Sequence, residues 1–139
     1  MLSPSEKKPS VGEALQPLDA GRIARSTLAF FGPASGDYHP IHLDIDVARS
    51  AGCDDVFAHG MLSMAYLARV LTNWVDQRQI RTLRGRFTAV TPIFGRPICS
   101  AVVTQISESS DGEQIATLEL TTQLEDGTQT IFGSATVAI

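Results

Sequence analysis

The side chains most able to do chemistry are concentrated in one stretch of the sequence. Three histidines lie between residues 39 and 59, and several aspartates lie among or beside them: His39, His42 and His59 with Asp37, Asp44, Asp46, Asp54 and Asp55. An imidazole has an unperturbed pKa of about 6.5, so it exchanges protons readily near neutral pH. A carboxylate in the same loop can hold a water molecule beside it. The stretch therefore favours proton-transfer chemistry.

Two other interpretations apply to the same side chains. Histidine and aspartate are metal ligands, but no helical H-x-x-x-H or H-x-x-E spacing places two of them on one face, so we expect no metal site. A single histidine or aspartate in a loop rich in glycine and proline commonly caps or braces a turn. Taken one at a time, these residues fit that structural role at least as well as a chemical one.

Helices and a loop must position this stretch. Apolar residues at helical spacing in segment 19–31 predict an amphipathic helix, capped by Asp19 and stopped by Gly32-Pro33. Segment 34–40 (ASGDYHP) consists of turn-forming residues and is expected to be a loop. A short helix is predicted over residues 46–51.

The second half of the chain changes pattern. Segment 60–75 (GMLSMAYLARVLTNWV) is apolar on nearly every side, which predicts a helix buried on all sides. Runs rich in Thr, Val, Ile and Phe then predict strands at 82–90, 98–106, 114–123 and 128–139. Turn residues between the last three strands predict hairpins and an antiparallel meander. The expected fold class is α+β, with an antiparallel sheet wrapped around one long central helix.

Composition and charge narrow the class of protein. The 139 residues are 43% hydrophobic and 19% charged, which predicts one globular domain at 11–139 after a flexible lead-in at 1–10. No stretch approaches the roughly 20 apolar residues of a membrane span, and no signal-peptide pattern is present, so we expect neither membrane insertion nor export. Two cysteines without ligand spacing favour a reducing, cytoplasmic compartment. A net charge of −4 argues against nucleic-acid binding.

A longer pattern joins the histidine-rich stretch to the start of the predicted central helix. Segment 35–44 reads SGDYHPIHLD, and segment 58–62 reads AHGML. Together they resemble the hydratase motif of the MaoC-like family of hot-dog proteins, which includes (R)-specific enoyl-CoA hydratases and 3-hydroxyacyl thioester dehydratases. The resemblance covers residues 14–139. It departs from the family at His39, where Asn is usual, and at Arg96, where Asp is frequent.

The resemblance implies a hot-dog fold and a hydro-lyase that hydrates trans-2-enoyl thioesters to (R)-3-hydroxyacyl thioesters, or dehydrates them. It implies that Asp37 and His42 are the catalytic acid/base dyad. It also implies that the N–H of Gly60, at the positive end of a helix, forms the oxyanion hole for the thioester carbonyl.

Other residues of the pattern have structural alternatives. Asp44 is expected to cap the short helix, His59 to support the loop by hydrogen bonding, and Ser35 to satisfy a turn. Met61 fits a core position or an acyl pocket. Arg84 and Arg86 share a strand face and could meet a phosphate of the substrate's carrier, although a solvated charged face is the simpler interpretation.

The resemblance implies no cofactor beyond the CoA or acyl carrier protein that bears the acyl group. We expect a second hot-dog subunit, identical or related, because one sheet around one helix leaves open edge strands. Two other functions remain open. A hot-dog thioesterase would need a carboxylate near the central helix, and residues 58–69 contain none. A subunit of a heteromeric dehydratase is the second, although the presence of Asp37 and His42 argues against an inert chain.

Overall fold

The structure is a computed structural model that describes residues 8–139. Its helices are α1 (Arg25–Ser35), α2 (Ile45–Ser50) and α3 (Gly60–Thr72), with two 3-10 turns, η1 (Pro40–His42) and η2 (Gln77–Gln79). Its strands are β1 (Leu18–Asp19), β2 (Ile80–Phe87), β3 (Ile98–Glu108), β4 (Gln114–Gln123) and β5 (Gln129–Ala138). The lead-in predicted at 1–10 falls largely outside the described residues and stays a prediction.

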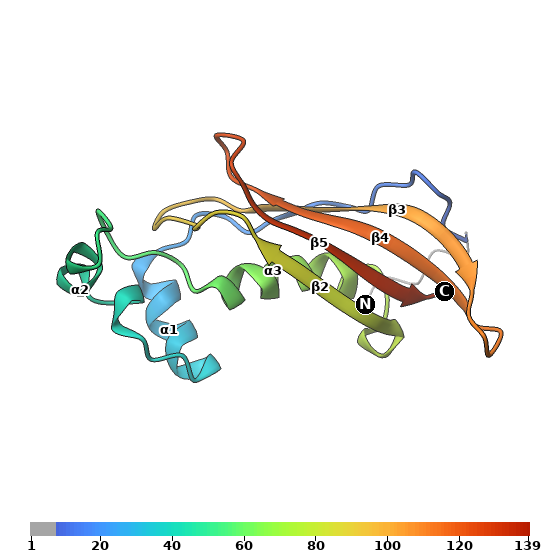
Figure 1. Cartoon of the computed structure of the whole chain (residues 1–139), viewed down its shortest axis with the longest axis horizontal. Helices are drawn as coiled ribbons and strands as arrows, with labels where there is room; N and C mark the ends of the chain where they lie inside the picture. The colour runs from blue at the N-terminus through green and yellow to red at the C-terminus, as the bar shows by residue number, and fades with distance from the viewer. Residues whose placement is uncertain (1–7) are drawn as a thin grey trace.

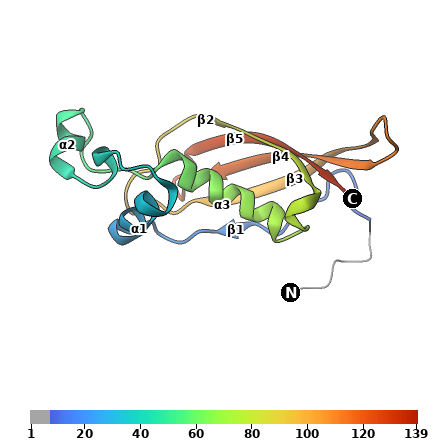
Figure 2. The ribbon, with the colours of Figure 1, turned by 90° about the horizontal axis from the view of Figure 1, so that it is seen from below.

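The five strands form one antiparallel sheet in the order β1-β3-β4-β5-β2. The sheet curves over α3 (Figure 1), and the view from below shows α3 lying across one of its faces (Figure 2). Strands β3, β4 and β5 are neighbours joined by hairpins, as the sequence predicts. The α+β hot-dog architecture, an antiparallel sheet around a central helix, is therefore confirmed.

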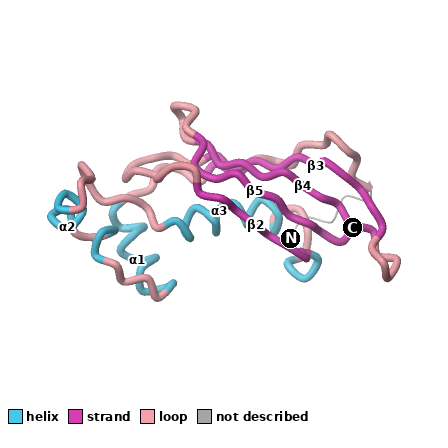
Figure 3. Tube along the Cα trace, viewed as in Figure 1, coloured by secondary structure: helices cyan, strands magenta, loops and turns pink. Residues whose placement is uncertain are grey.

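The main core lies between α3 and the sheet. In β4, alternate residues Ala116, Leu118 and Leu120 are fully buried while Glu119 between them is exposed, which is the period of two that a one-sided strand requires. These residues pack with the buried face of α3, which contributes Leu67, Val70 and Leu71. A second, smaller core lies beyond one end of the sheet, where α1 and α2 meet the start of α3 (Figure 3).

Helix α1 begins later than the sequence predicts. Asp19 does not cap it, because this residue belongs to strand β1 and its carboxylate accepts a hydrogen bond from the Gly21 N–H. The carboxylate also pairs with Arg96, which lies far along the chain. The helix instead starts at Arg25. A short-range capping signal was thus overridden by a long-range ion pair that the local sequence does not reveal.

Helix α1 also ends later than predicted, since it continues through Pro33 to Ser35. A proline near the end of a helix removes only a little of the helical hydrogen bonding, so it need not stop the helix. Gly36 is the residue that stops it. Its φ of 78° is left-handed, and its N–H bonds the carbonyl of Gly32 at 2.9 Å.

Helix α3 begins at Gly60 as predicted, but it is not buried on every side. Met61 is 63% exposed, and Ala65 and Arg69, one and two turns further on, are also exposed. Apolar composition alone did not distinguish the exposed face of the helix from the buried one, because methionine and alanine are apolar residues that can occupy either face. The helix ends at Thr72 rather than at residue 75.

The strands agree with prediction in number and order, apart from the two-residue strand β1, which is too short to leave a pattern. Strand β2 occupies 80–87 rather than 82–90. After it, the Thr88 N–H still bonds the Thr130 carbonyl, and the chain then passes beside the start of α3, where the Ala58 N–H bonds the Thr91 carbonyl at 2.9 Å. This departure from the sheet opens space next to the N-terminus of α3.

Candidate active site

The loop between α1 and α2 is held by short-range hydrogen bonds. The Asp37 carboxylate accepts a hydrogen bond from the backbone N–H of His39 at 3.2 Å. The Nδ1 atom of His39 accepts one from the N–H of Ile41 at 3.1 Å, which caps η1. Pro40 is the first residue of η1, where its missing N–H costs nothing. His42 is the last residue of this turn, so the turn fixes the position of the His42 backbone.

Asp37 and His42 form a close pair. The Asp37 Oδ2 atom lies 3.8 Å from His42 Nε2, while His42 Nδ1 lies 2.7 Å from the carbonyl oxygen of Phe57. Because a carbonyl only accepts, Nδ1 of a neutral His42 carries the proton and Nε2 is left with a lone pair. Two acceptors at this separation do not bond each other, and they suit a water molecule that donates one hydrogen to each. The pair can therefore hold a water and take a proton from it.

His59 supports His42 by stacking. The two imidazole rings are 4.0 Å apart between centroids and inclined by 27°, and the Phe31 ring meets the His59 ring edge-on at 5.0 Å. His59 is only 1% exposed, and neither ring nitrogen has a hydrogen-bond partner among residues 8–139. The ring contacts visible here are therefore stacking and edge contacts, and the support of the loop by hydrogen bonding from His59 stays a prediction. Burial lowers the pKa of His59, the nearby His42 lowers it further, and Asp37 opposes both, which favours a neutral ring.

The same three side chains come near to metal-ligand spacing, because donor atoms of Asp37, His42 and His59 lie within 4.8 Å of one another. Their orientation does not suit an ion, however. The lone pairs of an imidazole lie in the ring plane, so two nearly parallel stacked rings direct their nitrogens side by side rather than toward a common point. The arrangement fits a proton-transfer cluster better than a metal centre.

The N-terminus of α3 lies directly after His59 in the chain. The Leu62 N–H bonds the His59 carbonyl at 3.1 Å, and within the described part of the chain the N–H groups of Gly60 and Met61 have no such acceptor. These free donors and the positive end of the helix can stabilise negative charge on an oxygen. A side chain at position 60 would meet the Phe87 ring, since an added Cβ would lie 3.2 Å from two of its atoms.

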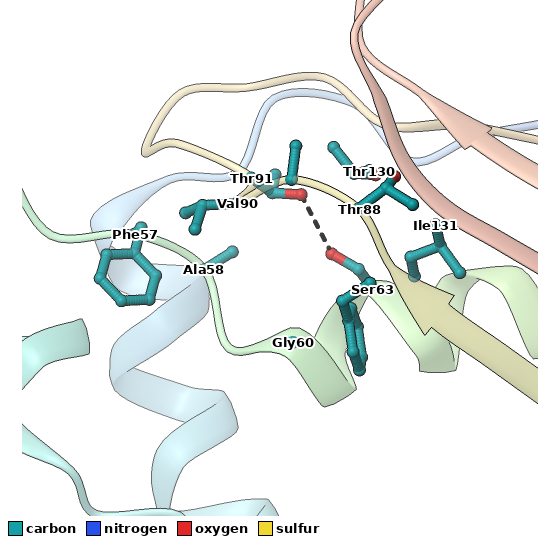
Figure 4. A pocket seen from close by; sticks show the side chains of 11 residues that line it. Phe57, Ala58, Gly60, Ser63, Thr88, Val90, Thr91, Thr130 and Ile131 are labelled. Atoms are coloured by element: carbon teal, nitrogen blue, oxygen red, sulfur yellow. Dashed lines mark hydrogen bonds between the residues drawn. The ribbon is translucent and has the colours of Figure 1, made fainter.

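A cavity of about 340 Å³ opens beside this helix end. Its walls come from the start of α3, the end of β2 and strand β5, and they include Ala58, Gly60, Phe87, Val90 and Ile131. Figure 4 shows one polar feature on its wall, where the buried hydroxyls of Ser63 and Thr91 face each other at 3.3 Å. A mostly apolar cavity next to free backbone donors suits an acyl group whose polar end points to the helix.

The remaining residues of the sequence motif lie around this centre. Asp44 caps α2 as predicted, since its carboxylate accepts a hydrogen bond from the Asp46 N–H at 2.9 Å. Ser35 satisfies the end of α1, where its hydroxyl donates to the Phe31 carbonyl at 2.7 Å. It touches Asp37 only through a long bond of 3.4 Å from the Asp37 N–H, so it does not orient the carboxylate directly.

Three residues considered for substrate binding lie outside the cavity of this protomer. Met61 is largely exposed on α3. Arg84 and Arg86 alternate along β2 with Gly85 and Phe87, which face Met64 and Gly60 of α3, so the arginines project from the opposite face of the strand. Phe87, which sequence reasoning did not single out, lies on the cavity side instead. The alternation of β2 is the signal that could have found it.

Arg96 has a structural role at the position where it departs from the family pattern. Its guanidinium pairs with Asp19 of β1 and with Glu125 in the β4–β5 hairpin. Arg22 binds the same Glu125 at 2.8 Å. The Arg96 guanidinium and the Gly21 N–H lower the pKa of Asp19 to about 2. This network ties three distant segments together and makes no contact with Asp37 or His42.

Comparisons with known proteins identify the family of this chain. The family model "MaoC like domain" matches residues 6–126. A curated relative, 3-hydroxyacyl-thioester dehydratase Z of Mycobacterium tuberculosis, is 25% identical over 128 residues, which is 84% of this chain and 81% of that protein. Among the residues that the structure describes, no helix is long and apolar enough to cross a membrane.

Solved structures support the fold. An R-hydratase from Pseudomonas aeruginosa matches with a TM-score of 0.80 and 22% identity, over 93% of this chain and 81% of that one. The ChsH1-ChsH2 complex from Mycobacterium tuberculosis contains a chain that matches with a TM-score of 0.82 and 17% identity, over 95% and 99% of the two chains. At these identities the likeness concerns the fold alone. Because the family model matches residues 6–126, which is most of this chain, the chain belongs to the MaoC-like dehydratase family.

Proposed function

We propose that this protein is a hydro-lyase that adds water across the double bond of trans-2-enoyl thioesters to give (R)-3-hydroxyacyl thioesters, or catalyses the reverse dehydration. The observation that carries the proposal is the Asp37–His42 pair, 3.8 Å apart, whose histidine stacks on His59, the residue directly before a helix end with free N–H groups. A proton-transfer pair and an oxyanion donor are the two parts that this reaction needs. Membership of a dehydratase family points the same way.

The proposed reaction begins with a water molecule held between Asp37 Oδ2 and His42 Nε2. His42 takes one proton while the water oxygen bonds to C3 of the acyl group, and the electron pair of the double bond moves toward the thioester oxygen. The Gly60 N–H stabilises the negative charge on that oxygen. A proton then passes from the pair to C2 and the carbonyl re-forms, so that one H and one OH have been added. Because both groups lie together, both additions reach the same face of the double bond.

The reaction needs no cofactor, since protons are the only species moved besides the water oxygen. The acyl chain would enter the cavity beside Gly60, with the CoA or acyl carrier protein arm outside it. Ser63 and Thr91 give the mostly apolar wall of that cavity a pair of facing hydroxyls. A thioesterase is the second function considered, but helix α3 places no carboxylate beside the cavity, and no other observation favours it.

We also propose that a second hot-dog subunit pairs with β2. This strand lies at the edge of the sheet, and it is eight residues long, which leaves a row of unpaired backbone groups. One matched structure, the ChsH1-ChsH2 complex, contains two different chains. Sedimentation of the purified chain distinguishes a homodimer from a chain that requires a related partner, and a fully active monomer would contradict both.

The function is tested with purified protein and trans-2-enoyl-CoA substrates of several chain lengths, by following the loss of the conjugated thioester absorbance. We expect hydration, and we expect Asp37→Asn and His42→Ala each to lower turnover by roughly a hundredfold or more while the fold is kept. Release of free CoA in place of hydration would support a thioesterase. A folded variant of either residue with near-normal hydration would show that the assigned pair is wrong.

A further inference from the structure

His39 connects the two members of the proposed catalytic pair. Its backbone N–H donates to the Asp37 carboxylate at 3.2 Å, and its side-chain Nδ1 accepts from the Ile41 N–H at 3.1 Å. The second bond caps η1, the three-residue turn that ends with His42. The turn that carries His42 is therefore capped by a hydrogen bond that His39 accepts, while the His42 ring itself contacts the Phe57 carbonyl and His59.

That hydrogen bond exists in only one charge state of the His39 ring. In the neutral ring, Nδ1 can accept while Nε2 carries the hydrogen, but in the protonated ring both nitrogens are donors. A protonated His39 would oppose the Ile41 N–H with an N–H of its own, and rotation of the ring would not help because both edges donate. The cap is therefore lost when the ring takes up a proton.

The titratable groups that face the His39 ring are few. The Asp37 carboxylate bonds the backbone N–H of His39 rather than its ring, and η1 contributes the His42 imidazole, whose centroid lies 6.3 Å away in an edge-on arrangement. Over residues 8–139, no salt bridge or side-chain hydrogen bond joins the His39 ring to α1, α2, α3 or the sheet. His39 is exposed, so protons from solvent reach it directly.

We propose that His39 is a proton-sensitive positioning residue, which caps the turn that carries His42 only while the His39 ring is neutral. The inference rests on the proposed function, because it assigns a regulation to that site. Protonation of the ring removes the cap and deprotonation restores it, so acid loosens the turn that carries His42. His39 thus acts through the Ile41 N–H and not on the substrate.

Replacement of His39 by asparagine keeps the cap of η1 and removes the group that takes up the proton. An asparagine side-chain oxygen accepts the same bond and stays neutral at every pH in question. We expect kcat/KM to fall in both proteins when the pH is lowered from about 8 to 5.5. The fall should be about fivefold larger in the wild type than in His39→Asn, because the loss of one cap changes an equilibrium by about that factor. His39→Ala, which lacks an acceptor, should have lowered kcat/KM at both pH values. Identical pH profiles for wild type and His39→Asn would overturn the proposal.

A measurement without substrate keeps this test separate from the proposed function. The amide resonance of Ile41 is followed by NMR from about pH 8 to 5 in the His42→Gln background, where the neighbouring ring cannot titrate. We expect the resonance to move with His39 protonation, and to stay still when His39→Asn is added. A still resonance in the presence of His39 overturns the proposal, even if the protein proves to be a hydratase. A moving one supports the switch, even if the hydratase assay fails.

Discussion

Two regions of the molecule bury different kinds of side chain. We call α3 and the five-stranded sheet the body, and α1, η1, α2 and the start of α3 the helical end. In the body, the buried residues of α3 and the sheet are almost all apolar, and their burial follows the periodicity of each element. At the helical end, α1, η1 and the start of α3 enclose two buried histidines, His42 and His59, stacked on each other. The body therefore gains stability from hydrophobic burial, whereas the helical end gives up some stability to place polar groups out of water.

The difference predicts two kinds of mutational response. Changes in the body should alter the free energy of unfolding and leave the chemistry of folded molecules unchanged. Changes to the polar side chains of the helical end and to Gly60 should alter turnover or a pH dependence more than they lower stability. Single variants in each region test this division.

Leu118→Ala should have the largest effect on stability. Leu118 is fully buried in the centre of β4, so its truncation leaves a cavity and lowers the free energy of unfolding by about 2–5 kcal/mol. Urea unfolding measures the loss, and turnover per folded molecule should stay close to that of the wild type. The matched control is Glu119→Ala, one residue away on the exposed face. An equal loss in both variants would contradict the division of the strand into a core face and a solvent face.

Gly60→Val should lower turnover about tenfold or more, because a side chain there crowds the free N–H groups at the start of α3. The valine would also press on the Phe87 ring, which can be relieved by adding Phe87→Ala. We expect the double variant to recover stability but not turnover, measured by urea unfolding and steady-state kinetics. Full activity of a folded Gly60→Val protein would rule out this helix end as the oxyanion site.

His59→Phe should change the acid response of stability, with an effect smaller than either of the two above. Burial lowers the pKa of His59 in the folded state, so below the ordinary histidine value the unfolded chain binds a proton that the folded chain resists. This contribution to stability is intact at higher pH and declines as the pH falls through that ordinary value. Phenylalanine keeps the ring and removes the titration. Urea unfolding at about pH 8 and pH 5.5 should therefore show a smaller acid loss for the variant, and an equal loss would contradict a buried neutral His59.

Arg96→Ala should have the smallest effect, and only on the body. Arg96 holds the pKa of Asp19 at about 2, below its ordinary 3.8, so the ion pair adds stability above that ordinary value and loses it as the pH falls toward 2. An NMR titration of the Asp19 carboxyl should show the pKa rising toward the ordinary value in the variant. Turnover should not change. A marked loss of turnover would show that this network affects the active site, and it would contradict the separation of the two regions.

Sequence reasoning was most successful where structure follows local periodicity. The range of β4, the two hairpins, the start of α3 and the Asp44 cap could be predicted because alternation, turn residues and capping preferences act over a few positions. The long motif also brought Asp37, His42 and His59 into consideration together. The structure places these three side chains within one small cluster.

What the sequence did not reveal depends on contacts between distant segments. Asp19 looked like a helix cap until its pairing with Arg96 was visible, and strand β1 is too short to have a pattern of its own. His59 was considered only for hydrogen bonding, and its contacts with the rings of Phe31 and His42, which come from two other segments, were not foreseen. Phe87 was overlooked because its closeness to Gly60 arises from how β2 lies along α3.

The most direct test of the account is the stereochemistry of water addition in deuterium oxide. A water held between Asp37 and His42, 3.8 Å apart, must deliver its oxygen and its deuteron from one side of the substrate. We predict an (R)-3-hydroxyacyl thioester with the deuterium at C2 added to the same face as the hydroxyl, determined by NMR of the product. Addition to opposite faces would contradict the assignment of this pair as the source of both groups, and an (S)-hydroxyl product would contradict the proposed reaction.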